Sequence, residues 1–76
     1  MNKKLLSEFV NKTKVKILEV NCGRDFSRRL SELGLLSGEE LVIIKNDQCG
    51  PVIVKILESK IALGRGEANK IYAEEI

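Results

Sequence analysis

The sequence predicts a mainly β fold, a small barrel of about five short strands with a short N-terminal helix and one helix inserted after the first strand. Three observations lead to this prediction. The chain has 76 residues, which suits one small domain spanning residues 1–76. Short runs rich in apolar, β-branched residues recur between turn signals over its second half, as in strands. Short strands at close spacing are too few for two full sheets, and closure into a barrel protects their edges.

The composition indicates a globular protein, with 43% hydrophobic and 32% charged residues. Disordered chains have far fewer apolar residues for their charge. No apolar run approaches the roughly 20 residues of a membrane span, and no long apolar stretch follows the N-terminal lysines as in a secretory signal. Thirteen basic and eleven acidic residues give a formal charge of +2, a small excess for a nucleic-acid-binding protein. We therefore expect a cytoplasmic protein with no nucleic acid partner.

The N-terminal segment predicts a short helix that must dock on the rest of the domain. Leu5, Leu6, Phe9 and Val10 fall on one side of such a helix. One or two helical turns do not stand alone in water, so docking is required.

The next segment, 13–20, predicts the first strand. Its apolar Val15 and Ile17 alternate with lysines, and the alternation slips at Leu18. Such a slip is typical of a β-bulge. The lysines on the other face are Lys12, Lys14 and Lys16.

A helix over residues 25–34 is the inserted helix. Asp25 suits the N-cap position, and Gly34 suits the left-handed residue that ends a helix, with Leu35 making the closing contact of a Schellman cap. The apolar positions expected to face the core are Phe26, Leu30 and Leu33. Gly38 then belongs to a turn.

The remaining strands follow in quick succession. Gly50 ends a polar loop, and Pro51 suits the start of a strand, where its missing N–H matters least. Residues 58–60 predict a short reversal, and residues 64–68 break the next strand with a helical turn. The expected strands are 41–45, 52–57, 61–63 and 71–76. Together with the strand over residues 13–20, they predict an SH3-like barrel.

Two blocks of this sequence resemble the FeoA family, small cytosolic components of bacterial ferrous iron transport. Residues 28–38 are similar to the family's R-R-L-x-E-L-G-hydrophobic-x-x-G core. The run Gly50-Pro51-Val52, followed by 61–64, Ala68 and Ile71, resembles its second block. Residues 6–9 resemble its opening helix. The reversal at 58–60 lacks the glycine often found there, and 64–66 is richer in glycine than usual.

The resemblance implies an SH3-like barrel that acts on the large membrane-bound, GTP-hydrolysing ferrous iron permease. It also implies regulation or adaptation rather than catalysis, and a cytoplasmic protein that the permease recruits to the inner face of the membrane. Self-association and the direction of regulation stay open.

The outward side of the inserted helix and the loop after it form the candidate partner-binding surface. Arginines offer charge-assisted, bidentate contacts to carboxylates, and an apolar side chain beside them can serve as an anchor. The candidate residues are Arg24, Arg28, Arg29, Glu32 and Leu36. An ordinary solvated helix face, with Arg28 partly offset by Glu32, is the alternative interpretation. Ile44 and Ile53 are further apolar side chains at positions where the pattern predicts solvent.

The sequence gives no constellation for catalysis or metal binding. It contains no histidine, which removes the commonest general base and the commonest transition-metal ligand. Cys22 and Cys49 lack the spacing of a metal site, and a cytosolic setting favours free thiols. We expect no catalytic residue, no metal ligand and no cofactor, and the protein is not expected to be an enzyme.

Two other functions remain open at this point. The first is the SH3-like domain of an iron-dependent repressor, which resembles the FeoA family in fold and sequence. Such a repressor would have a helix-turn-helix domain upstream, whereas this chain begins directly at the barrel. The second is a nucleic-acid-binding barrel, although Phe9, Phe26 and Tyr72 are the only aromatic residues available for stacking on bases.

Overall fold

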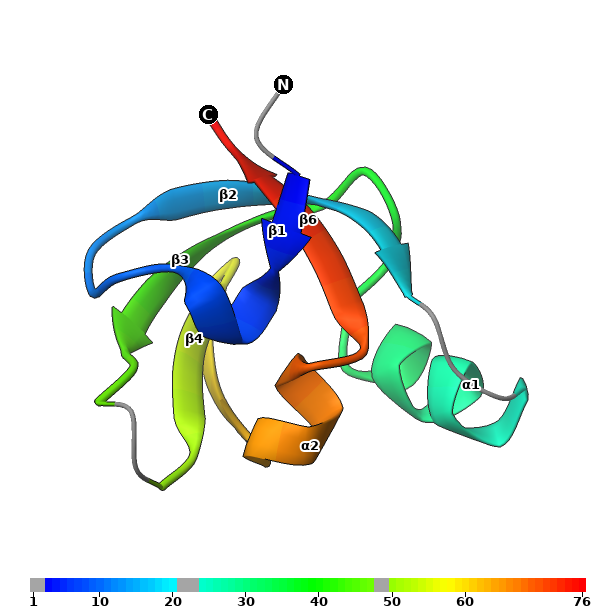
Figure 1. Ribbon diagram of the computed structural model, residues 1–76. Helices are drawn as coiled ribbons and strands as arrows, with labels where there is room; N and C mark the ends of the chain where they lie inside the picture. The colour runs from blue at the N-terminus through cyan, green and yellow to red at the C-terminus, as the bar shows by residue number, and fades with distance from the viewer. Residues whose placement is uncertain (1–2, 21–23, 48–49) are drawn as a thin grey trace.

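A computed structural model describes residues 3–20, 24–47 and 50–76 of the chain. Its six strands form one antiparallel sheet in the order β1-β6-β2-β3-β4-β5, which curls strongly on itself (Figure 1). The strands are β1 (Lys3–Leu5), β2 (Lys14–Val20), β3 (Glu40–Lys45), β4 (Val52–Ile56), β5 (Ser59–Leu63) and β6 (Ile71–Glu75). The predicted mainly β, SH3-like fold is confirmed, with one strand more than expected.

Three helical segments complete the described chain. The 3-10 helix η1 (Leu6–Glu8) follows β1, α1 (Arg24–Glu32) follows β2, and α2 (Arg65–Ala68) connects β5 to β6. Figure 1 shows α1 beyond the end of β2, at one side of the curled sheet. The predicted helix after the strand over residues 13–20 is therefore confirmed, as is the helical turn within 64–68.

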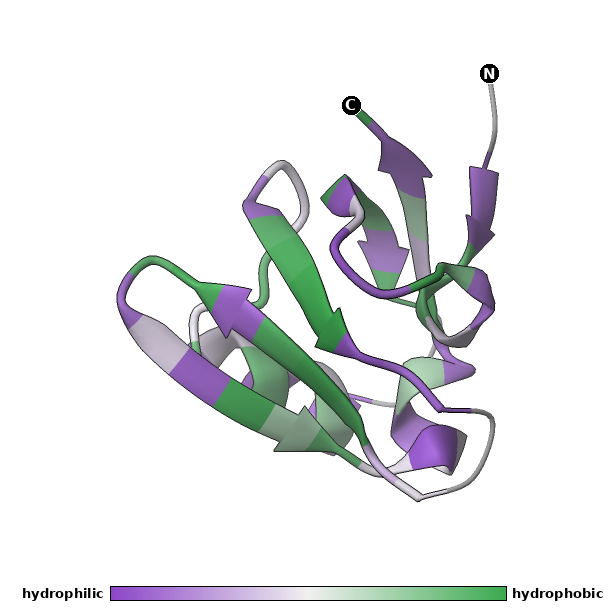
Figure 2. Cartoon of the chain, turned by 90° about the vertical axis from the view of Figure 1, so that its left-hand side faces the viewer, coloured by the Kyte–Doolittle hydropathy of each residue, from purple (hydrophilic) through white to green (hydrophobic). Residues whose placement is uncertain are grey.

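The core lies inside the curled sheet, where alternate side chains of each strand meet. On β4, Val52, Val54 and Ile56 point inward, and Ile53 and Lys55 lie on the other face. The buried hydrophobic residues are Leu6, Phe9, Val15, Ile17, Leu30, Leu35, Leu41, Ile43, Val52, Val54, Ile56, Leu63, Ala68, Ile71 and Ala73. Figure 2 shows both β3 and β4 hydrophobic along most of their length, whereas β5 begins with hydrophilic residues. The outer face of β3 is therefore also apolar, with half-buried Val42 and Ile44.

The predicted irregularity at Leu18 is present. The pairing of β2 with β6 runs from Val15↔Glu75 to Ile17↔Ala73 and resumes at Glu19↔Tyr72. One extra residue on β2 at this point is a β-bulge, which bends the strand and helps the small sheet to close on itself.

The N-terminal segment differs from the prediction. Residues 3–5 form strand β1 on β6, with Lys3 opposite Glu74 and Leu5 opposite Tyr72, instead of the first turn of a helix. Only one 3-10 turn follows, and the N–H of Leu5 at its start donates to Glu8 Oε1 at 2.8 Å. Pairing with a free sheet edge provides hydrogen bonds for the backbone that an isolated short helix could not retain in water. Val10, expected on the docked face, is 73% exposed.

Both ends of α1 refine the prediction. The helix begins at Arg24, so Asp25 lies in its first turn and is not the N-cap. At the other end, Gly34 has a φ of +90°, its N–H donates to the carbonyl of Ser31, and the N–H of Leu35 donates to that of Leu30. These two bonds are the Schellman cap that was expected. Leu33 is 43% exposed, because helical periodicity no longer applies beyond Glu32.

The reversal between β4 and β5 lies earlier than predicted. Ile56 pairs with Ser59, so the turn consists of Leu57 and Glu58, and β5 begins at Ser59. The sequence indicated residues 58–60 because Leu57 continues the apolar run of β4. In the structure Leu57 adopts a φ of +57°, which ends the strand one residue sooner.

Candidate partner-binding surfaces

The outward side of α1 exposes most of the charged residues expected there. Arg24, Arg28 and Glu32 are all exposed, and none of them forms an ion pair within residues 3–20, 24–47 and 50–76. The charge pairing expected between Arg28 and Glu32 is therefore not formed within the described residues. Arg24 and Arg28 are four positions apart on the helix, so they are surface neighbours with guanidinium groups available to a partner.

Arg29 lies on a different side of α1 and already has an acidic neighbour. Its Nη1 lies 3.3 Å from Glu67 Oε2 on α2. Lys70, just beyond α2, lies over the ring of Phe26 with Nζ 5.5 Å from the ring centroid. These two contacts, together with buried Leu30, hold α1 against the α2 region. The structure thus separates Arg29 from Arg24 and Arg28.

The loop from α1 to β3 begins at the Schellman cap, which lies beside the barrel. A Cβ at Gly34 would lie 4.0 Å from Ile56 Cδ1, so the cap packs beside the end of β4. Leu35 is buried, whereas Leu36 is 47% exposed, as the predicted apolar anchor requires. Gly38, with a φ of +92°, donates its N–H to the carbonyl of Ile17 and returns the chain to the sheet.

The lysines expected on one face of the strand over residues 13–20 do not join these arginines into one surface. Lys14 stands at the start of β2, roughly 20 Å along an extended chain from the end that leads into α1. Its Nζ lies 3.6 Å from Glu40 Oε1 on the neighbouring strand. The basic side chains of this part of the sequence are therefore spread over β2 and α1 and do not form one patch.

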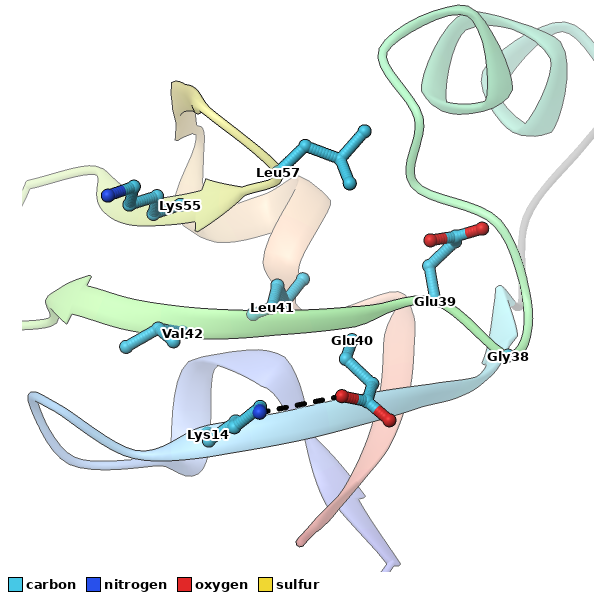
Figure 3. Close-up of a pocket in the computed structure, with 8 residues that line it drawn as sticks. All are labelled: Lys14, Gly38, Glu39, Glu40, Leu41, Val42, Lys55 and Leu57. Carbon is cyan, nitrogen blue, oxygen red and sulfur yellow. Dashed lines mark ion pairs between the residues drawn. The ribbon is translucent and has the colours of Figure 1, made fainter.

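A groove opens beside the α1–β3 loop, on the outer face of β3 and β4. Its volume is about 540 Å3. Figure 3 shows Leu57 reaching from the β4–β5 turn toward the α1–β3 loop, with Lys14 and Lys55 at one end of the groove and Glu39 at the other. The lining residues are Lys14, Gly38, Glu39, Glu40, Leu41, Val42, Lys55 and Leu57. Sequence reasoning did not select Lys55 or Leu57, although the missing turn glycine at 58–60 was a signal that this hairpin is unusual.

Asn46, in the polar loop that Gly50 ends, organises one end of the barrel. Its Nδ2 donates to the carbonyls of Ser7 and Phe9 at 2.8 and 2.6 Å, and its backbone N–H donates to Asn11 Oδ1 at 2.6 Å. Arg65 Nη2 donates to Asn46 Oδ1 at 3.0 Å. We call these five residues the Asn46 junction. A hollow of about 600 Å3 lies over it.

The turn before β4 is tied to the same region. Gly50 has a φ of +85°, and its carbonyl accepts a hydrogen bond of 3.2 Å from Arg65 Nε. Pro51 is exposed and precedes β4 directly, as expected. Arg65 is therefore a structural residue that joins α2 to the start of β4.

No group of three or more metal-ligating side chains lies together in the parts of the chain that the structure describes. Cys22 and Cys49, the two thiols considered in the sequence, lie outside the described residues. Over the same described ranges, none of the helices is both long and apolar enough to span a bilayer.

The curled six-stranded sheet and its exposed charged surfaces define a small SH3-like β domain. A family model described as the FeoA domain matches residues 4–75, so the chain belongs to the FeoA domain family. A protein of Methanocaldococcus jannaschii named "Putative Fe(2+) transport protein A" is 43% identical over 61 residues, which cover 80% of this chain and 71% of that protein.

Solved structures agree on the fold. The crystal structure of an iron uptake regulatory protein, FeoA, superposes with a TM-score of 0.93 at 21% identity, covering 99% of this chain and all of that one (100%). A manganese-dependent transcriptional repressor superposes with a TM-score of 0.88 at 14% identity, covering 97% of this chain and 42% of the repressor. At these identities the likeness concerns the fold alone. The FeoA family expected from the sequence is confirmed by the domain match over residues 4–75 and by the 43% identical relative.

Proposed function

We propose that this protein is a non-catalytic regulatory or adaptor component of ferrous iron uptake. It acts in the cytoplasm, as a single domain of residues 1–76, by binding the cytosolic part of a GTP-hydrolysing ferrous iron permease, which recruits it to the membrane. The observation that supports this best is the FeoA match over residues 4–75, together with a relative named for iron transport.

The outward side of α1 is the surface proposed to contact the permease. Arg24 and Arg28 are exposed neighbours without an ion pair in the described chain, and Leu36 adds an exposed apolar side chain in the following loop. Unpaired guanidinium groups can form bidentate bonds with partner carboxylates without first breaking an internal contact. Arg29 and Glu32 lie at the margins of this surface, and Arg29 would have to leave Glu67 to take part.

The experiment is a double charge reversal, Arg24→Glu with Arg28→Glu, tested by co-purification with the permease and by iron uptake in cells that lack the native chain. We expect an unchanged circular dichroism spectrum, because both side chains are exposed, with co-purification reduced about tenfold or more. Lys4→Glu with Lys12→Glu is the matched control, since it changes the net charge equally at exposed positions outside α1. If both double variants restore uptake as wild type does, α1 is only a solvated helix.

The similarity in fold to a manganese-dependent repressor favours a second candidate, the SH3-like domain of an iron-dependent repressor. The genes beside this one distinguish the two. A neighbouring gene for a large GTPase permease supports the first proposal, and a helix-turn-helix domain encoded upstream in the same reading frame supports the second.

A further inference from the structure

The β4–β5 hairpin has a turn residue that a freely exposed hairpin would not favour. Leu57 adopts a φ of +57°, in the left-handed region that costs an ordinary side chain energy and suits glycine or asparagine. Its side chain is also 82% exposed, the most exposed large hydrophobic residue described. Backbone strain and exposed apolar surface at one position are typical of binding sites, where a partner compensates for both.

The same hairpin places two lysines directly opposite each other. Lys55 of β4 pairs in register with Lys60 of β5, and directly opposed side chains on one face of a sheet interact. Neither lysine forms an ion pair with an acidic side chain in the described parts of the chain. Like charges at this spacing repel, and a carboxylate placed between them would reverse the sign of the interaction.

The groove beside this hairpin provides room and an apolar base. Val42 pairs in register with Lys14 on one side and with Lys55 on the other, so Val42 lies between two lysines on the outer face. Val42 and the side chain of Leu57 line the same groove of about 540 Å3. In Figure 3 Lys14 and Lys55 lie toward one end of the groove and Glu39 lies at the other, so the two ends of the groove differ in charge.

We propose that this groove binds an acidic segment of a partner protein. A carboxylate of the segment lies between Lys55 and Lys60, and an apolar side chain two or three residues away packs on Val42 and Leu57. The surface is separate from the outward side of α1, and the proposal does not require the partner to be the permease. It therefore goes beyond the proposed function.

The charges of the groove favour a peptide over a phosphate polymer or a membrane. Glu39 and Glu40 line the groove and would repel the successive phosphates of a nucleic acid, whereas a peptide can present opposite charges at its two ends. No aromatic side chain is among the lining residues, so bases would find no stacking platform. A single leucine in a concave groove is also a poor anchor for a flat bilayer.

The test is a titration of the full chain, labelled with 15N, followed by NMR. The probe is an acetylated and amidated peptide, Asp-Glu-Leu-Gly-Ser-Lys, whose acidic end suits Lys55 and Lys60 and whose basic end suits Glu39. We expect saturable shift changes centred on the amides of Val42, Lys55, Leu57 and Lys60. Lys55→Glu should reduce the affinity for the peptide roughly two- to fivefold, and Leu57→Asn should reduce it by a similar factor. Lys4→Glu, which removes an exposed lysine from β1 at the far end of the sheet order, is the matched control and should leave the affinity unchanged.

Each other result overturns the proposal. NMR shift changes spread over the amides of all lysines, or an equal loss of peptide affinity in Lys4→Glu, mean that the peptide is held by nonspecific charge attraction. Tighter binding of vesicles containing phosphatidylglycerol, or of poly-uridine RNA, at the same residues identifies a different occupant. Concentration-dependent shifts without peptide, abolished by Lys55→Glu, identify a second copy of the chain. Because the α1 double variant is not used here, failure of this test leaves the proposed function standing, and success does not depend on it.

Discussion

The Asn46 junction and the β4–β5 hairpin show opposite uses of polar and strained residues within one small barrel. At the junction, Asn46 and Arg65 donate five hydrogen bonds of 2.6–3.2 Å: three from Asn46 to Ser7, Phe9 and Asn11, and two from Arg65 to Asn46 and Gly50. These bonds tie together the N-terminal turn, the end of β3 and α2.

The hairpin shows the reverse. Lys55 faces Lys60, and Leu57 is exposed in a left-handed conformation. Satisfied polar groups stabilise a fold, whereas repulsion and strain reduce its stability and persist where a surface serves another purpose. The comparison therefore assigns stability to the Asn46 junction and binding to the hairpin.

The largest effect is expected from Asn46→Ala. The substitution removes the side-chain donor of the Ser7 and Phe9 carbonyls and the acceptor of Arg65, so three hydrogen bonds are lost and part-buried polar groups are left unpaired. We expect the free energy of unfolding to fall by about 2–4 kcal/mol, measured by urea denaturation. Asp47→Ala is the control, because among the described residues Asp47 forms an exposed ion pair with Lys45 and its loss should cost less than about 1 kcal/mol. Equal effects of the two variants would remove the distinction between the junction and an ordinary loop.

The next effect concerns the Schellman cap that separates α1 from the groove. Gly34→Ala should destabilise the domain by about 1–2 kcal/mol, because Gly34 has a φ of +90°. A Cβ there would meet Ile56 Cδ1 at 4.0 Å, an ordinary contact, so the cost is backbone strain and not a clash. Gly66→Ala is the control, since Gly66 lies in α2 with open space around it and has no positive φ. An equal decrease in melting temperature for both variants would contradict this account of the helix end.

Sequence reasoning could predict the parts of this comparison that depend on local patterns. The bulge at Leu18 follows from a slip in alternation, and the cap at Gly34 follows from a glycine after an apolar helix face. It could not predict β1, because the pairing of Lys3 with Glu74 depends on a strand at the other end of the chain. The role of Asn46 was hidden for the same reason.

The candidate surfaces show the same division. The exposure of Arg24, Arg28 and Leu36 could be predicted from helical periodicity and turn chemistry. The opposition of Lys55 and Lys60 depends on the register of β4 with β5, which a turn without glycine does not reveal. Binding surfaces that depend on register are thus found only when the strands are placed.

The smallest effect has the opposite sign and tests the hairpin directly. Leu57→Asn should raise the free energy of unfolding by about 0.5–1 kcal/mol, because asparagine tolerates a φ of +57° and removes an apolar side chain that is 82% exposed. Val10→Asn is the matched control: Val10 is 73% exposed but has no positive φ, so its stability should hardly change. If Leu57→Asn raises stability while weakening the acidic peptide, the strain at this turn is retained for binding and not for folding. If it lowers stability, Leu57 packs on the domain itself, and the contrast between hairpin and junction is lost.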